Sequence, residues 1–189
     1  MRIEVVVEVP AGSRNKYEVD HTTGAIWLDR QLFTATRYPA DYGFIPDTLA
    51  EDGDPLDCLV ILNEPTFPGC HLHVRPIGVF VMADEHGRDA KILAVLDDDV
   101  RNEWQDIGDV PEHLKHEIHH FFDIYKDLEP GKRTETIGWA DAPPPSARSR
   151  SRETATGPES RRRRRPGRRS RARSAGAPGV PPAGRSPRC

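Results

Sequence analysis

The sequence predicts an α+β fold in which a small, closed or nearly closed β-structure packs against one helix. Short segments with apolar residues at alternate positions, separated by turn residues, dominate the first hundred positions. One segment after residue 110 repeats its apolar residues with the helical period instead. Beyond residue 141 apolar residues nearly vanish, so we expect the core to be built from residues 1–141.

Five segments have the alternating pattern of strands: residues 3–9, 16–20, 57–62, 76–82 and 91–96. In the first of them Val5, Val7 and Val9 share one face, while Glu8 points off the other. The stretch 84–89 contains Gly87 and is expected to form the hairpin between the last two strands.

The helix is predicted to begin at Pro111, a first-turn position that proline tolerates, and to run to about Lys126. Pro130 and Gly131 follow it as end signals. Its apolar stripe, which we expect to face the core, consists of Leu114, Ile118, Phe121, Phe122 and Tyr125.

The charge of the chain divides it into two regions. Residues 1–141 contain 13 Lys+Arg and 28 Asp+Glu, a net charge of −15, and this region is long enough to bury one sizeable core. Residues 142–189 contain 14 Arg and 2 Glu, a net charge of +12, and Val180 is their only Leu, Ile, Val, Phe, Met, Trp or Tyr residue. We therefore predict one folded domain, 1–141, followed by a disordered tail rich in arginine, proline and serine.

The cysteines and the N-terminus indicate a cytoplasmic protein. Cys58, Cys70 and Cys189 match neither a disulfide framework nor a zinc spacing, which is typical of a reduced compartment. The chain starts directly with a strand pattern, and no apolar run approaches membrane-spanning length. We expect no membrane partner.

Three aspartates lie close together in the sequence: Asp52, Asp54 and Asp57. Carboxylates this close repel one another at neutral pH unless lysine, arginine or a metal ion neutralises them. Oxygen ligands favour a hard cation, so Mg²⁺ is expected before zinc. A solvated acidic loop is the alternative interpretation, since charged loops are common.

Further acidic and basic side chains complete an inventory suited to phosphate chemistry. Asp84 and Asp89 flank the predicted hairpin, and strand alternation places Asp89 on the same side as Lys91. Other cations, phenols and carboxylates come from scattered segments: Glu8, Lys16, Glu18, Arg30, Tyr38, Tyr42, Tyr125 and Lys126. Carboxylates that hold divalent ions, beside groups that bind phosphate oxygens, are what metal-assisted phosphoryl transfer to water requires.

The motif Asp-Gly-Asp-Pro-Leu-Asp at 52–57 resembles the signature of the soluble family I inorganic pyrophosphatases. Four further blocks agree in the same order, at 15–18, 38–45, 84–91 and 121–129. The resemblance implies Mg²⁺-dependent hydrolysis of pyrophosphate to two phosphates by a cytoplasmic homohexamer. It also implies a five-stranded closed barrel of the oligonucleotide-binding type with flanking helices.

The resemblance also assigns roles to individual residues. The metal ligands it implies are Glu8, Asp52, Asp57, Asp84 and Asp89. The groups it implies for holding pyrophosphate oxygens are Lys16, Arg30, Tyr42, Lys91, Tyr125 and Lys126. For the catalytic proton acceptor that prepares the attacking water it leaves two candidates, Asp54 and Asp89. His21 and His86 resemble those of actinobacterial members, and either pH tuning of the site or an ordinary loop position fits them.

Two motifs that suggest other metals are rejected. The stretch from His116 to His120 has the H-E-x-x-H pattern of zinc proteases. At about 100° per residue, however, these two histidines lie nearly opposite the apolar stripe, so we expect them at the surface. The loop beginning at Asp52 fails the calcium-binding EF-hand pattern, because Leu56 and Asp57 occupy the positions that need Asp/Asn and Gly.

The basic tail supports a second functional hypothesis. Arg161 to Arg165 would neutralise phosphates of RNA or another polyanion, with little sequence preference. The alternative function is therefore a catalytically weakened pyrophosphatase-like protein whose tail binds polyanions. A family member would continue after Asp141 into an amphipathic helix, whereas this chain continues with Pro143 to Pro145. We hypothesise that residues 142–189 are a frameshift product.

Overall fold

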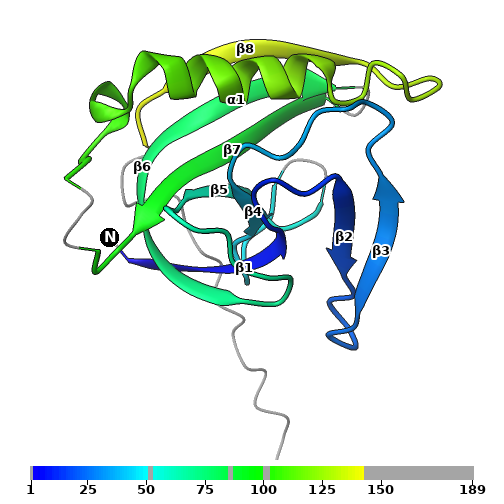
Figure 1. Cartoon of the computed structure of the whole chain (residues 1–189). Helices are drawn as coiled ribbons and strands as arrows, with labels where there is room; N and C mark the ends of the chain where they lie inside the picture. Colours follow the sequence, from blue (N-terminus) through cyan, green and yellow to red (C-terminus); the bar gives the residue numbers. More distant parts are fainter. Residues whose placement is uncertain (1, 51–52, 85–86, 100–102, 143–189) are drawn as a thin grey trace, which may run out of the picture. The chain divides into compact units, whose positions relative to one another are not determined.

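The computed structural model describes residues 2–50, 53–84, 87–99 and 103–142, which all belong to the first of two compact units of the chain (Figure 1). The strands and helical segments in this part are, in chain order, β1 (Ile3–Val9), β2 (Asn15–Val19), β3 (Ile26–Gln31), β4 (Asp41–Phe44), β5 (Asp57–Ile61), β6 (His71–Asp84), β7 (Gly87–Leu96), the 3₁₀ helix η1 (Ile107–Asp109), α1 (Glu112–Ile124) and β8 (Thr134–Ala140). Strands dominate, as the alternating patterns predict.

Five of the strands pair in a closed ring, in the order β1, β4, β5, β7, β6 and back to β1. All these pairings are antiparallel except the parallel pair of β5 and β7. The 14-residue strand β6 closes the ring, because its first half pairs with β1 and its second half carries β8 along the outer edge. The expected closed or nearly closed β-structure is therefore present as a ring of strands.

The central residues of β5 and β7 are buried on both faces of the ring. Successive residues of β5, such as Cys58 and Leu59, contribute to two different hydrophobic clusters, and Ile92 and Leu93 of β7 do the same. One cluster includes the buried stripe of α1, whose Phe122 stacks on Phe80 of β6 with ring centroids 5.4 Å apart. Figure 1 shows α1 lying alongside β8 over these strands. Packing on both sides holds the ring strands rigid, as a catalytic site on them requires.

The strands β2 and β3 form a separate antiparallel hairpin beside the ring (Figure 1). Two polar contacts connect it to the rest of the domain. The backbone N–H of Val19 donates to Oε1 of Glu8 at 2.8 Å, and Nε of Arg30 donates to Oε1 of Glu129 at 3.0 Å. The position of this hairpin therefore depends on side chains as well as on the backbone.

The structure corrects several details of the sequence predictions. The five predicted strands are present, but the segment predicted over 76–82 extends over His71–Asp84. Strands β3, β4 and β8 were not predicted. Flanking helices were expected, yet the described residues contain α1 and the single turn η1 only. Pro111 lies one position outside α1 as its N-cap, and the helix ends at Ile124 rather than near residue 126.

The predicted disordered tail lies outside the described residues, apart from Ala142. In the part of the chain that the structure covers, no helix has the length and apolar character needed to cross a bilayer.

Candidate active site

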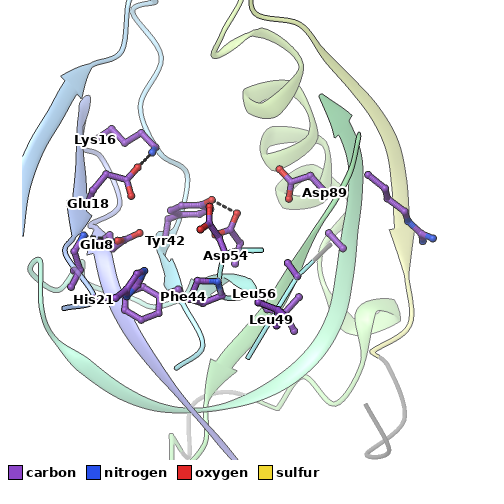
Figure 2. A pocket seen from close by; sticks show the side chains of 16 residues that line it. Glu8, Lys16, Glu18, His21, Tyr42, Phe44, Leu49, Asp54, Leu56 and Asp89 are labelled. Atoms are coloured by element: carbon purple, nitrogen blue, oxygen red, sulfur yellow. Dashed lines mark hydrogen bonds and ion pairs between the residues drawn. The ribbon is translucent and has the colours of Figure 1, made fainter. Parts of the chain in front are cut away.

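A cavity of about 600 Å³ opens between the ring and the β2–β3 hairpin (Figure 2). Eight residues singled out from the sequence line it, namely Glu8, Lys16, Glu18, His21, Tyr42, Asp54, Asp57 and Asp89. They come from β1, β2 and the turn after it, β4, the loop before β5, the start of β5, and β7. Figure 2 shows the carboxylates of Glu8, Glu18 and Asp89 pointing toward the space that they enclose. The fold thus brings together acidic residues that are far apart in the sequence.

The ammonium group of Lys91 joins two of these carboxylates. Its Nζ lies 2.7 Å from Oδ2 of Asp57 and 3.0 and 2.9 Å from the two oxygens of Asp89. The hydroxyl of Tyr42 donates to Asp57 and lies 3.3 Å from the same Nζ. Lys91 is only 2 % exposed, and the rings of Tyr42 and Phe122 each lie 5.3 Å from its Nζ. Asp89 and Lys91 share a side, as strand alternation predicts.

Burial and charge shift the pKa values of these groups in opposite directions. Burial alone would lower the pKa of Lys91, but Asp57 and Asp89 outweigh it and raise that pKa well above its usual value. Burial raises the pKa of Asp89 despite the opposing effect of Lys91. Burial, together with Asp57, also raises the pKa of Tyr42 well above that of an ordinary tyrosine. Lys91 is therefore a cation and Tyr42 a neutral hydrogen-bond donor at neutral pH.

The opposite wall of the cavity contains Glu8, Lys16 and Glu18. Glu8 is 7 % exposed, and burial raises its pKa although the N–H of Val19 and the charge of Lys16 oppose this effect. Lys16 contacts Glu18, as expected from their shared face, and burial together with Arg30 lowers its pKa. This wall therefore presents two carboxylates and a lysine that is easier to deprotonate than usual.

The other predicted residues that the structure describes are not part of the cavity lining. Nζ of Lys126 lies 3.0 Å from Oδ2 of Asp84, so a proposed phosphate ligand is paired with a proposed metal ligand. Tyr125 is buried, and the charges of Asp89, Asp57 and Asp84 contribute to its raised pKa after burial itself. The structure pairs Arg30 with Glu129, as described above. Asp52 and His86 lie outside the described residues.

The donor set fits a hard cation. Asp57 and Asp89 already flank a positive group, and carboxylate oxygens are the ligands that Mg²⁺ prefers. Among the residues that the structure describes, which omit Asp52, no three His, Cys, Asp or Glu side chains group closely enough to hold a metal ion by themselves. Mg²⁺ is usually bound through one or two carboxylates together with water and substrate phosphates, so these residues fit that kind of site better than a cage of protein ligands.

The zinc-protease pattern lies on the exposed side of α1. His116, Glu117 and His120 are exposed on α1, as their position opposite the apolar stripe predicts.

Sequence reasoning missed several residues that line the cavity, including Val19, Leu49 and Arg88. Leu49 and Val19 carry no chemical signal that a sequence pattern would reveal. Arg88 stands between Gly87 and Asp89 in a matched block, and its charge was a signal that was available.

A cavity with carboxylates on its walls and buried ammonium and phenol groups beside them defines a phosphate-handling hydrolase of the metal-assisted kind. Comparisons with known proteins make the class specific. The family model for inorganic pyrophosphatase matches residues 5–148. Inorganic pyrophosphatases of Leifsonia xyli and Streptomyces coelicolor are each 60 % identical to this chain, over 142 and 140 residues, and each match covers 74 % of this chain and 86 % of the relative. The crystal structure of inorganic pyrophosphatase from Thermus thermophilus shares 55 % identity and a TM-score of 0.72, over 74 % of this chain and 82 % of that one.

The chain belongs to the inorganic pyrophosphatase family. It is an inorganic diphosphatase, and its reaction is the hydrolysis of inorganic pyrophosphate. The matches give no support to the alternative of a weakened relative whose basic tail binds RNA or other polyanions.

Proposed function

We propose that this chain hydrolyses inorganic pyrophosphate to two phosphates by direct attack of water, with Mg²⁺ as the metal ion. Metal dependence accompanies membership of the family. The choice of Mg²⁺ rests on the all-oxygen donor set of Glu8, Asp57 and Asp89, to which we add Asp52 and Asp84. When bound, the metal lowers the pKa of the attacking water and neutralises charge on the substrate.

The observation that carries this proposal is the buried Lys91 between Asp57 and Asp89. Pyrophosphate is highly anionic, so a site for it needs fixed positive charge close to the carboxylates that bind the metal. Lys91 provides that charge, and its raised pKa keeps it protonated throughout the physiological range. The ammonium of Lys16 faces the same cavity and donates to a phosphate oxygen, and the hydroxyl of Tyr42 does so once its single O–H turns from Asp57 to the substrate.

Three further groups bind phosphate oxygens from the edge of the site: Arg30, Tyr125 and Lys126. We assign the proton acceptor for the attacking water to Asp54 in preference to Asp89. Both oxygens of Asp89 already accept hydrogen bonds from the ammonium of Lys91, which leaves them fewer lone pairs with which to accept a proton from water. Asp54 lines the cavity next to Asp57.

The proposal also covers the barrel type, the domain boundary and the assembly of the enzyme. We propose that the ring of strands is a five-stranded barrel of the oligonucleotide-binding type, that the catalytic domain ends near residue 141, and that the enzyme is a cytoplasmic homohexamer. The end of β8 at Ala140 supports the domain boundary. Residues 142–189 are proposed to be a separate tail of frameshifted origin. Sequencing the gene through codon 142 tests this, since an intact frame contradicts it.

The assay that tests the function is phosphate release from pyrophosphate by the full chain, with Mg²⁺ and then with EDTA. We expect EDTA to abolish the activity and Asp54→Asn to lower kcat about a hundredfold or more, within the range by which general acid–base groups contribute. Asp57→Asn should cost more than Tyr42→Phe, because it removes a metal ligand and a partner of Lys91 together. Activity that survives Asp54→Asn combined with Asp57→Asn contradicts the proposed site.

A further inference from the structure

Glu129 is a buried carboxylate that the proposed mechanism leaves without a role. The buried polar side chains in the described part of the chain are Glu8, Asp41, Lys91 and Glu129. Glu8 and Lys91 belong to the cavity, and Asp41 accepts hydrogen bonds from the backbone of Ala11 and from Thr66, which gives it a structural task. Glu129 is 8 % exposed and contributes its carboxylate to one side chain, that of Arg30. A buried carboxylate is costly unless it is paired, so this pairing needs an explanation.

The pair connects two parts of the domain that no strand pairing connects. Arg30 lies on β3, in the hairpin beside the ring, whereas Glu129 follows α1. Nε of Arg30 donates to Oε1 of Glu129 at 3.0 Å, across 99 residues of sequence. The side chain of Arg30 is 26 % exposed and that of Glu129 is 7 % exposed, so solvent screens this pair less than a surface pair.

The backbone of Glu129 is itself fixed by a turn that carries two proposed substrate ligands. Its N–H donates to the carbonyl of Lys126 at 2.8 Å, and its carbonyl accepts from the N–H of Lys132 at 3.2 Å. Tyr125 and Lys126 therefore move with Glu129. On the other side of the pair, Arg30 lies opposite Lys16 in the register of β2 and β3, so Lys16 moves with Arg30.

We propose that Glu129 is a positioning residue for substrate binding. It holds the guanidinium of Arg30 by its Nε edge, and it thereby fixes the hairpin cations Arg30 and Lys16 relative to Tyr125 and Lys126. A guanidinium fixed at Nε presents its remaining N–H groups in a planar fork, which suits a phosphate group. Asp29 also contacts Arg30, through Nη1, but it is the neighbouring residue on the same strand and cannot set the position of the hairpin.

This inference rests on the proposed role of Arg30, and the experiment separates the two. Steady-state kinetics with pyrophosphate and Mg²⁺ are measured for the full-length wild type, Glu129→Gln, Arg30→Ala and the double variant. Glu129→Gln keeps the shape and an acceptor oxygen but removes the charge. We expect KM to rise about tenfold and kcat to stay within about threefold, because an interaction that orients the substrate similarly in ground and transition states is lost. In the Arg30→Ala background, Glu129→Gln should change KM less than about twofold, because residues that act through one another are not additive.

The control is Glu112→Gln, which removes the carboxylate of the Glu112–Lys115 pair on α1. The side chain of Glu112 is 75 % exposed, and we expect its substitution to change KM less than about twofold, as for surface ion pairs in general. Equilibrium binding of inorganic phosphate by calorimetry provides a readout without turnover, and Glu129→Gln should weaken it about as much as it raises KM. Glu129→Asp, which keeps the charge but shortens the side chain, should give an intermediate KM and replaces the Gln variant if that variant does not fold.

Three outcomes overturn the inference. A wild-type KM for both Glu129 variants shows that the pair does not position the substrate. A rise in KM that is as large in the Arg30→Ala background as in the wild type shows that Glu129 does not act through Arg30. A wild-type KM for Arg30→Ala alone removes Arg30 from the proposed site, and the inference fails with that assignment while the activity itself stands.

Discussion

Replacement of Lys91 by methionine tests the electrostatics of the site in metal-free protein. Lys91→Met keeps most of the side-chain volume but leaves Asp57 and Asp89 facing each other without their common cation. Breaking a buried ion pair by removing one partner costs about 3–5 kcal/mol, and here the two carboxylates that remain are partly exposed, at 28 % and 23 %. With a typical slope of about 2 kcal/mol per molar urea, the unfolding midpoint should fall by about 2 M.

The loss should depend on pH. Burial already raises the pKa of Asp89 in the wild type, and Lys91→Met removes the charge that opposes this rise, so in the variant protonation of Asp89 favours the folded state as the pH falls through that raised pKa. In the wild type, Lys91 has a raised folded-state pKa, and its stabilisation is complete below the unfolded pKa of lysine. The difference between variant and wild type should therefore be largest near pH 7 and should narrow toward pH 4.5.

Urea unfolding in EDTA, followed by circular dichroism at several pH values, measures both effects. Lys115→Met is the control, since Lys115 pairs at 2.6 Å with the exposed Glu112 one turn away on α1, and such pairs contribute about 0.5 kcal/mol or less. The reasoning is refuted if Lys91→Met lies within about 1 kcal/mol of the wild type, well below the cost of a broken buried pair. A difference that stays constant from pH 7 to pH 4.5 refutes the assignment of the loss to the two carboxylates.

Three more perturbations follow from the structure. Gly43→Ala would place a Cβ 2.0 Å from the backbone oxygen of Val6, so β4 must separate from β1. We expect urea unfolding to show that the free energy of unfolding falls by about 3 kcal/mol or more. An unfolding midpoint equal to that of the wild type contradicts the close approach of the two strands. Cys58 is fully buried, and burial raises the pKa of its thiol. Iodoacetamide at pH 7.5 should therefore leave Cys58 unmodified in native protein, which peptide mass spectrometry of the labelled chain would show. Rapid labelling would indicate that β5 opens. Glu117→Gln in the H-E-x-x-H pattern should leave both zinc content and pyrophosphate hydrolysis unchanged, because this side chain is exposed on α1. If metal analysis finds zinc in the wild type that is lost from the variant, the rejection of a zinc site on α1 is wrong.

Two of the three missed strands, β3 and β4, have faces that differ little in burial. All four positions of β4 are buried, so Asp41–Phe44 shows no alternation and reads as part of a turn-rich stretch. In β3 the consecutive residues Ile26, Trp27 and Leu28 are all exposed, which also hides the period of a strand. Closure of the ring depends on β1 pairing with both β4 and β6, and no local pattern encodes such long-range pairing.

The site was predictable to the extent that its contacts are local. The pairing of Asp89 with Lys91 follows from alternation over two residues, and so does the contact of Lys16 with Glu18. The contact of Lys91 with Asp57 required knowledge of which strands are neighbours. The pairing of Arg30 with Glu129 is more distant still, and neither residue carries a signal that identifies the other.

The parallel register of β5 and β7 places Asp57 directly opposite Lys91, with Cys58 opposite Ile92 at the next position. The charged pair is therefore fixed by backbone alignment, and a single-residue insertion at the start of β5 or β7 would set Asp57 opposite Ile92 or Lys91 opposite Cys58. Insertions in the connection from 62 to 70 would leave that alignment intact. Natural length variation, and any engineered fusion, should thus be tolerated after β5 and excluded from the first residues of β5 and β7.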